Sequence, residues 1–303
     1  MKHLPRIVFF LLLCIFLPAS RLPAQELPAD YQDVLRYLSR SGDYKAAVLK
    51  VNLPRNDLHV QIAGHDTPTP FGFGGWIGLT KGDGGMDVLM GDLVLTQEEV
   101  NPVLSALLDH CLEATALHNH FFWEEPRLFF LHVHGHGKAL DLAQRIKPAL
   151  DLIGHAAPAT APSAPVAAAV SPALDAAALT KIIGRPGEAL GPVQKFTVGR
   201  DDLHLTEMGA VIKARMGLNS WAAFAGSDAD AQIAGDIAMR ESEVQSVLKA
   251  LRAHGLNIVA IHQHMLKTQP AVFFLHYWGR GPAAKLAEGF RAALDLLGSS
   301  DAH

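Results

Sequence analysis

Alternating apolar and polar residues predict several β-strands in the first half of the chain. Leu58, Val60 and Ile62 alternate with polar neighbours, as residues do in a strand that buries one face. Four further segments are apolar or alternating runs of strand length: 76–79, 88–95, 115–123 and 128–134. Only residues 124–127 join the last two, so we expect those two strands to form a hairpin.

Two segments carry the longer period of an amphipathic helix. Residues 96–99 (Thr-Gln-Glu-Glu) are a capping box, and apolar residues spaced by three and four follow it to about Leu112. A second helix is predicted from about Lys138 to Leu152, just before Gly154, a residue type common at helix ends. Predicted strands outnumber predicted helices, and each helix stands alone between strands. The predicted fold class is therefore α+β, with a largely antiparallel sheet and two main helices on one face of it.

The second half of the chain repeats the first. An offset of 145 residues maps 57–59 (Asp-Leu-His) onto 202–204, and an offset of 144 maps 118–120 (His-Asn-His) onto 262–264 (His-Gln-His). Between the copies, residues 155–174 are mostly Ala and Pro, which indicates an extended linker. We therefore expect two tandem repeats, one over residues 25–154 and one over 175–303, packed against each other as an intramolecular pseudo-dimer.

The first residues of the chain predict export. Residues 1–24 resemble a signal peptide, with a basic start, an apolar stretch over 7–17 and a small residue, Ala24, before the expected cleavage point. The apolar stretch is shorter than the roughly 20 residues that span a bilayer, so we expect no stable membrane span. Leucines precede Cys14 where a lipoprotein signal has small residues, so lipidation is not expected. The predicted location is periplasmic or extracellular.

Composition limits the possible partners. The chain is 49% apolar and 18% charged with a net charge of −4, and it contains no long run of Lys and Arg, so we expect no nucleic-acid partner. Once a signal peptide is removed, Cys111 is the only cysteine left, which excludes an internal disulfide. The apolar helical stretch around Cys111 predicts a buried, unreactive thiol.

Histidines gather on one predicted face in each unit. Because side chains alternate across a strand, His118 and His120 point to the same side. If the hairpin is centred on Glu125, His132 lies directly opposite His118, with Cβ atoms roughly 4.5–5.5 Å apart. Imidazoles at that separation could share one metal ion. The second unit repeats this cluster with His262, His264 and His276.

The same alternation adds candidates from outer strands. One more histidine and one carboxylate in each unit face away from the apolar positions. They are His59 and Asp92 in the first unit and His204 and Asp236 in the second. Such donors suit a divalent transition metal, zinc above all, with copper, nickel or iron as alternatives. We therefore predict an exported metal-binding protein whose partner is a metal ion or a small-molecule ligand. His134 and His136 are weaker candidates, because the second unit has Trp278 and Arg280 at those positions.

Three other interpretations stay open. Glu124 or Glu125, beside the first cluster, could be the catalytic base of a metal-dependent hydrolase that uses a metal-bound water. Trp76 and Trp221 could be stacking surfaces of a small-ligand or carbohydrate-binding module, although core packing is the simpler interpretation. The histidines could also be structural, either hydrogen-bonded to one another or lining the contact between the units.

The histidine motifs also resemble a known family. Residues 118–120 (His-Asn-His), 124–127 (Glu-Glu-Pro-Arg) and 129–132 (Phe-Phe-Leu-His) resemble the signature of the LppY/LpqO family of bacterial exported proteins. The resemblance extends over both units and implies export, without implying a particular activity. The chain departs from the family pattern in lacking a lipoprotein signal, and its second unit has Lys267 and Thr268 in place of the acidic residues.

Overall fold

Two similar units make up the structure. It is a computed structural model and describes residues 26–155, 174–266 and 268–298. The predicted signal peptide and nearly all of the predicted linker lie outside the described residues. Each unit has a six-stranded antiparallel sheet with three helices. The predicted fold class, two tandem α+β repeats, is confirmed.

The main sheet of the first unit has the strand order β1-β2-β5-β6-β9-β7. Its strands are β1 (Asp43–Lys45), β2 (Val48–Pro54), β5 (Gly74–Lys81), β6 (Asp87–Thr96), β9 (Leu128–Gly137) and β7 (Glu113–His118). Its helices are α1 (Ala29–Leu38), α2 (Gln97–Asp109) and α3 (Ala139–Leu150). A small separate sheet has the order β4-β3-β8, from β3 (Val60–Ile62), β4 (His65–Thr67) and β8 (Glu124–Glu125).

The second unit repeats this arrangement with the order β10-β11-β14-β15-β17-β16. Its strands are β10 (Glu188–Leu190), β11 (Val193–Gly199), β14 (Asn219–Gly226), β15 (Ala231–Arg240), β17 (Val272–Gly281) and β16 (Asn257–His262). Its helices are α4 (Ala176–Ile183), α5 (Val244–Ala253) and α6 (Ala283–Leu294), and its small sheet pairs β12 (Leu205–Glu207) with β13 (Ala210–Ile212). Four 3-10 turns complete the described elements: η1 (Thr69–Phe71), η2 (Asp83–Gly85), η3 (Ala214–Met216) and η4 (Glu241–Glu243).

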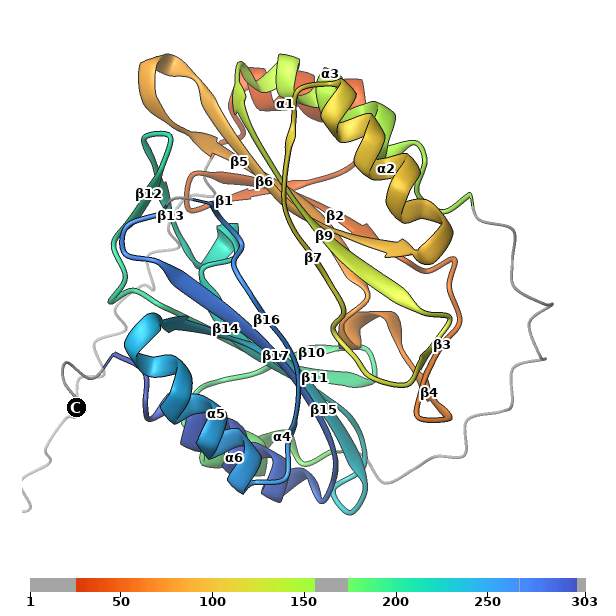
Figure 1. The fold of residues 1–303 in the computed structure, drawn as a ribbon, viewed down its shortest axis with the longest axis vertical. Coiled ribbons are helices and arrows are strands. Elements are labelled where there is room, and N and C mark those ends of the chain that lie inside the picture. Colours follow the sequence, from red (N-terminus) through yellow and green to blue (C-terminus); the bar gives the residue numbers. More distant parts are fainter. Residues whose placement is uncertain (1–25, 156–173, 267, 299–303) are drawn as a thin grey trace, which may run out of the picture.

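The two sheets face each other, and the helices of each unit cover the outer face of its own sheet (Figure 1). One apolar core lies between sheet and helices within each unit. Two further apolar clusters combine residues of both units, with Val48 of β2 and Leu205 of β12 in one and Phe71 of η1 and Val193 of β11 in the other. Burying apolar residues between the sheets stabilises the pairing of the units by about 25 cal/mol for each Å² of apolar surface removed from water.

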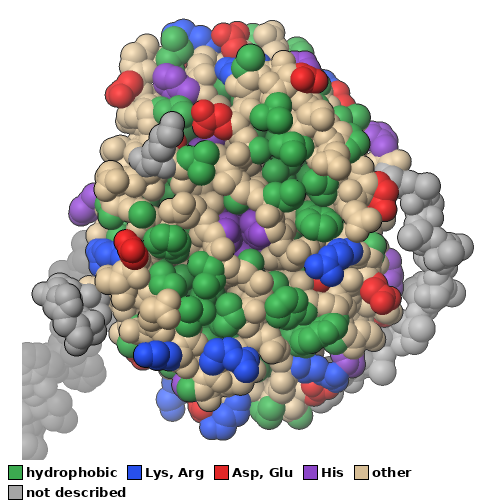
Figure 2. Space-filling view, in the orientation of Figure 1, with side chains coloured by type: hydrophobic (Ala, Val, Ile, Leu, Met, Phe, Trp, Pro, Cys, Tyr) green, Lys and Arg blue, Asp and Glu red, His purple; other side chains and the backbone are tan. Residues whose placement is uncertain are grey.

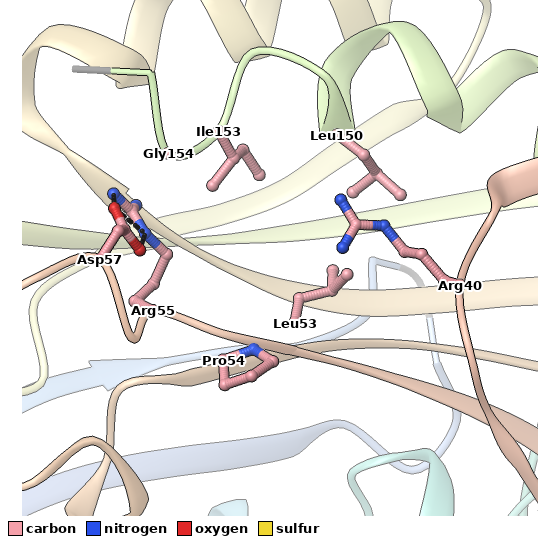
Figure 3. Close-up of a pocket in the computed structure, with 8 residues that line it drawn as sticks. All are labelled: Arg40, Leu53, Pro54, Arg55, Asp57, Leu150, Ile153 and Gly154. Atoms are coloured by element: carbon pink, nitrogen blue, oxygen red, sulfur yellow. Dashed lines mark hydrogen bonds and ion pairs between the residues drawn. The ribbon is translucent and has the colours of Figure 1, made fainter.

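A buried ion network recurs in both units. In the first, the Arg55 guanidinium is 3% exposed and donates to Glu99 at 2.7 Å and to Asp57 at 2.7 Å. The Glu99 carboxylate also accepts the backbone N–H groups of Thr96 and Gly154. The Arg55–Asp57 pair borders a pocket of about 80 Å³ beside the end of α3 (Figure 3). The second unit repeats the network with Arg200, Asp202, Glu243 and Gly298.

Two expectations from the sequence need correction. Helices α1 and α4 were not predicted, although Tyr31, Val34 and Leu38 of α1 have helical spacing, because each helix is short and its pattern covers few turns. Cys111 is exposed rather than buried, since it follows α2 in the left-handed conformation, with φ 56°. Its counterpart is Gly255, with φ 75°.

No helix within the described ranges is long and apolar enough to cross a membrane.

Candidate metal centre

The histidine motifs lie where the two units meet. β7 and β16 are edge strands of their sheets, and they run side by side at the centre of the molecule (Figure 1). His118 ends β7 and His262 ends β16. His120 and His264 follow in the loops, while His132 and His276 lie on β9 and β17, the next strands inward.

The hairpin register differs from the predicted one. Phe130 lies opposite His118, and His132 lies opposite Ala116. The predicted short turn was wrong because β7 stops at His118, and the chain that follows makes a wider connection containing β8, which pairs with β3. His118 and His132 are therefore diagonal neighbours on one face, still within reach of each other. The second unit has the same register, with His276 opposite Ala260.

The two predicted clusters form one group in the structure. The ring centroids of His118 and His262 are 3.7 Å apart, so these two rings stack across the contact between the units. On either side of them, His120 stacks on His276 at 3.6 Å, and His132 stacks on His264 at 4.1 Å. These two flanking contacts are equivalent, because the repeat relates His120 to His264 and His132 to His276. We call these six residues the histidine cluster: His118, His120, His132, His262, His264 and His276.

Distances within the histidine cluster fit shared coordination. The Nε2 atoms of His118 and His132 are 3.1 Å apart, close to the roughly 3.3 Å between two nitrogens that each bind a tetrahedral zinc ion at about 2.0–2.1 Å. Within the described residues, two groups of three have donor atoms all within 4.8 Å of one another. One group is His118, His132 and His262, and the other is His118, His120 and His276. Each group takes ligands from both units.

Many ring nitrogens of the histidine cluster are buried without a partner. Among the residues that the structure describes, both nitrogens of His120, both of His262 and Nε2 of His276 have no hydrogen-bond partner. An unsatisfied buried polar group costs about 1–3 kcal/mol. Five of them would therefore cost an amount comparable to the whole stability of a typical domain, about 5–15 kcal/mol. A metal ion accepts one lone pair from each imidazole that it binds, so it would remove part of this cost.

Two backbone carbonyls hold rings in the orientation that metal binding needs. The Nδ1–H of His276 donates to the Gly235 carbonyl at 3.2 Å, and the Nδ1–H of His118 donates to the Asn119 carbonyl at 3.3 Å. Each contact places the lone pair on Nε2, as in many metal-ligating histidines, and Nε2 of His118 lies within hydrogen-bond distance of Nε2 of His132, at 3.1 Å. The rings of His120 and His264 are also fixed, since they stack on Phe130 and Phe274 at 3.2 and 3.4 Å.

The imidazoles of the histidine cluster are held neutral. Burial lowers the pKa of His118 to about 4 and that of His262 to about 2. Burial, followed by the neighbouring imidazoles, lowers the pKa of the other four members well below its ordinary value. A neutral imidazole is the form that binds a metal ion.

Two buried carboxylates stand beside the histidine cluster. Asp92 Oδ1 is 3.9 Å from His132 Nε2, and Asp236 Oδ2 is 3.7 Å from His264 Nε2. One oxygen of each carboxylate is buried and has no hydrogen bond to any described residue. Burial raises the pKa of Asp92 to about 7 and that of Asp236 well above its ordinary value. A bound cation would favour the ionised form of both groups.

The structure does not bring His59 and His204 to the histidine cluster. Both side chains are exposed, and His59 faces Asp66 at 3.7 Å. The expectation that they join it failed because their segments lead into the small sheets, β3 with β4 and β12 with β13, instead of the main sheets. His136 is exposed as well, whereas His134 is buried and faces Glu207 of the second unit at 3.8 Å.

The remaining candidates lie outside both ligand groups. Glu124 is buried in β8, where burial raises its pKa, and Glu125 is exposed. Trp76 and Trp221 are partly buried and pack against the clusters between the units. The sequence did not predict that histidines from different units would pair. The one indication of this pairing was the recurrence of the motif in the two halves of a predicted pseudo-dimer.

The histidine cluster reaches the surface at one place. Histidine side chains are visible at the centre of the face shown in Figure 2, with apolar side chains around them. His118 and His262 are the only partly exposed members, since the other four are buried. Exposed apolar side chains occur next to these two histidines in the sequence, at matched positions of the two units, with Leu117 at 46% and Ile261 at 47%.

The fold and cluster define a two-repeat protein with one histidine centre shared by its units. The chain belongs to the family described as "DUF1529: Domain of Unknown Function (DUF1259)", which matches residues 32–152 and 177–296, once in each unit. A search of curated proteins found no match.

Solved structures give only distant likenesses. A trimeric bacterial microcompartment shell protein, PduB, is 16% identical, with 84% of this chain and 90% of that chain covered and a TM-score of 0.20. EtuB from Clostridium kluyveri is 9% identical, with 85% and 91% covered and a TM-score of 0.20. Scores this low carry no argument about this protein.

Proposed function

We propose that this protein binds a divalent transition metal ion at the histidine cluster, through ligands from both units. The observation that carries the proposal is the convergence of imidazoles from both units, with the donor atoms of each group of three within 4.8 Å of one another. Because His118 belongs to both ligand groups, the proposal is one ion per chain. The preferred ligands are His118, His132 and His262, because Asp92 lies next to His132 and could complete the set.

The donor set favours zinc, copper, nickel or iron over calcium or magnesium, which prefer oxygen ligands. Zinc fits best, since it accepts three imidazoles and a carboxylate in tetrahedral geometry. The proposal is limited to binding: among the described residues, neither Glu124 nor Glu125 forms a hydrogen bond or ion pair with a member of the histidine cluster.

Metal analysis of tag-free protein tests the proposal. Protein reconstituted with zinc and then desalted should retain about one ion per chain, whereas a His118→Ala/His262→Ala variant should retain almost none. A His59→Ala/His204→Ala variant is the matched control, because it removes two exposed histidines outside the cluster and should keep the ion. Equal metal content in all three proteins would refute the proposal.

We propose in addition that the protein is exported to the periplasm or beyond. Support comes from the apolar stretch over residues 7–17 and from the resemblance to the LppY/LpqO family of exported proteins. Mass spectrometry of protein recovered from the periplasmic fraction should give a mature chain that begins near Gln25. A chain found only in the cytoplasm with residues 1–24 intact would contradict export.

A further inference from the structure

Two lysines at matched positions face the space between the units. Lys50 on β2 and Lys195 on β11 are related by the same offset as the other repeated residues. Two positions earlier on the same strands, Val48 and Val193 belong to the apolar clusters between the units. Since side chains alternate along a strand, both lysines point toward the opposite unit.

Each of these lysines rests on a tryptophan. Lys50 Nζ lies 4.3 Å from the ring centroid of Trp76, and Lys195 Nζ lies 4.4 Å from that of Trp221. In the part of the chain that the structure describes, neither ammonium group has an ion pair or a hydrogen bond. The two indoles thus hold two cations in place without neutralising them.

A third cation lies beside Lys50. Arg215 of η3, in the second unit, forms an ion pair with the Asp43 carboxylate and donates to the Asp43 carbonyl at 3.1 Å. Asp43 is the strand partner of Lys50, so the guanidinium is held next to that lysine. The Nε–H of Arg215 is buried and has no hydrogen-bond acceptor within the described ranges. The first unit has Pro70 at the matched position, so this third cation exists on one side only.

The positive charges act on one another. Burial, followed by the charges of Lys195 and Arg215, lowers the pKa of Lys50 to about 8, and the smaller opposing effects of Asp43 and Asp92 do not offset it. Burial also lowers the pKa of Lys195. Asp43 is already paired with Arg215, and Glu188, the strand partner of Lys195, forms no ion pair with it among the described residues. Cations held close together with too little counter-charge favour the binding of an anion.

We propose that Lys50, Lys195 and Arg215 form a binding site for a small oxyanion, a phosphate or carboxylate group, between the two units. The unpartnered Nε–H of Arg215 and the two ammonium groups supply donors of the kind that recognise such groups. No residue of this site belongs to the histidine cluster: the lysines lie on β2 and β11, and three strands lie between β2 and β7 and between β11 and β16 in the order of their sheets.

Thermal unfolding of the full chain at constant ionic strength tests the oxyanion site. Inorganic phosphate, titrated at pH 7 against a sodium chloride reference, should raise the unfolding temperature along a saturable curve. Sodium acetate and sulfate, run in parallel, distinguish a carboxylate from a tetrahedral oxyanion. Lys195→Met and Arg215→Met should each weaken the phosphate effect at least tenfold in midpoint concentration. Methionine keeps the apolar stem that packs on the indole.

Lys249→Met is the matched control, because Lys249 is an exposed lysine on α5 and its loss should leave the phosphate midpoint unchanged. No saturable rise of the wild-type unfolding temperature with phosphate, sulfate or acetate would overturn the proposal, and this result needs no variant to fold. An equal phosphate response in wild type and a Lys50→Met/Lys195→Met variant would overturn it as well.

Discussion

Replacing Glu99 tests how the buried ion network supports each unit. The Glu99 carboxylate accepts from Arg55 at 2.7 Å, from the Thr96 N–H at 2.8 Å and from the Gly154 N–H at 2.7 Å. It therefore ties the start of α2 to the chain beyond α3. Glu99→Ala removes these acceptors and leaves the Arg55 guanidinium, 3% exposed, with Asp57 as its only carboxylate.

Breaking a buried ion pair by removing one partner costs about 3–5 kcal/mol, because the other charge stays buried. We expect a loss of this size in the free energy of unfolding, measured by urea denaturation followed by circular dichroism. Asp151→Ala is the control: it removes the exposed pair with Lys147 on α3, worth about 0.3–0.5 kcal/mol. A loss below about 1 kcal/mol for Glu99→Ala would refute the reasoning.

Three further outcomes follow from the same structure. Cys111→Gly should raise the free energy of unfolding by about 1 kcal/mol, because the residue has φ 56° and the matched Gly255 has φ 75°; no gain in urea denaturation would contradict this. Metal-free protein should lose stability as the pH falls from about 6.5 to about 4, because His118 takes up a proton near pH 6.5 when unfolded but only near pH 4 when folded. The His118 contribution is about 3 kcal/mol, and a flat stability profile across this window would count against buried neutral imidazoles. Residues 25–154 and 175–303, produced as separate chains, should retain zinc only when mixed, since each ligand group draws on both units; zinc retained by either chain on its own would contradict a shared site.

Much of the fold follows from the sequence because the repeat doubles each signal. The strands around Trp76 and Val88 and the helix after Thr96 have clear periodicity, and all three occur close to their predicted positions. Helix α1 was missed although Tyr31, Val34 and Leu38 have helical spacing, because its pattern is short. The short strands β1, β4 and β8 could not be predicted, since elements of three residues or fewer depend on packing with distant parts of the chain rather than on their own pattern.

The histidine centre could be predicted only in part. Strand alternation correctly places His118 on the same face as His132, but it cannot give the hairpin register, which depends on the pairing of β8 with β3. Nor can a local pattern show that His262 of the other unit stacks on His118, because that contact arises from the docking of two sheets. The exclusion of His59 has the same origin, since the separate small sheet near it is a tertiary feature.

The most direct measurement of the central claim is an anomalous-scattering map, recorded at the zinc edge from crystals of the reconstituted, tag-free protein. The account predicts one peak per chain, about 2.0–2.1 Å from Nε2 of His118 and of His132 and within coordination distance of His262. A peak at the exposed His59 or His204, or no peak in crystals that contain ordered histidine rings, would contradict it.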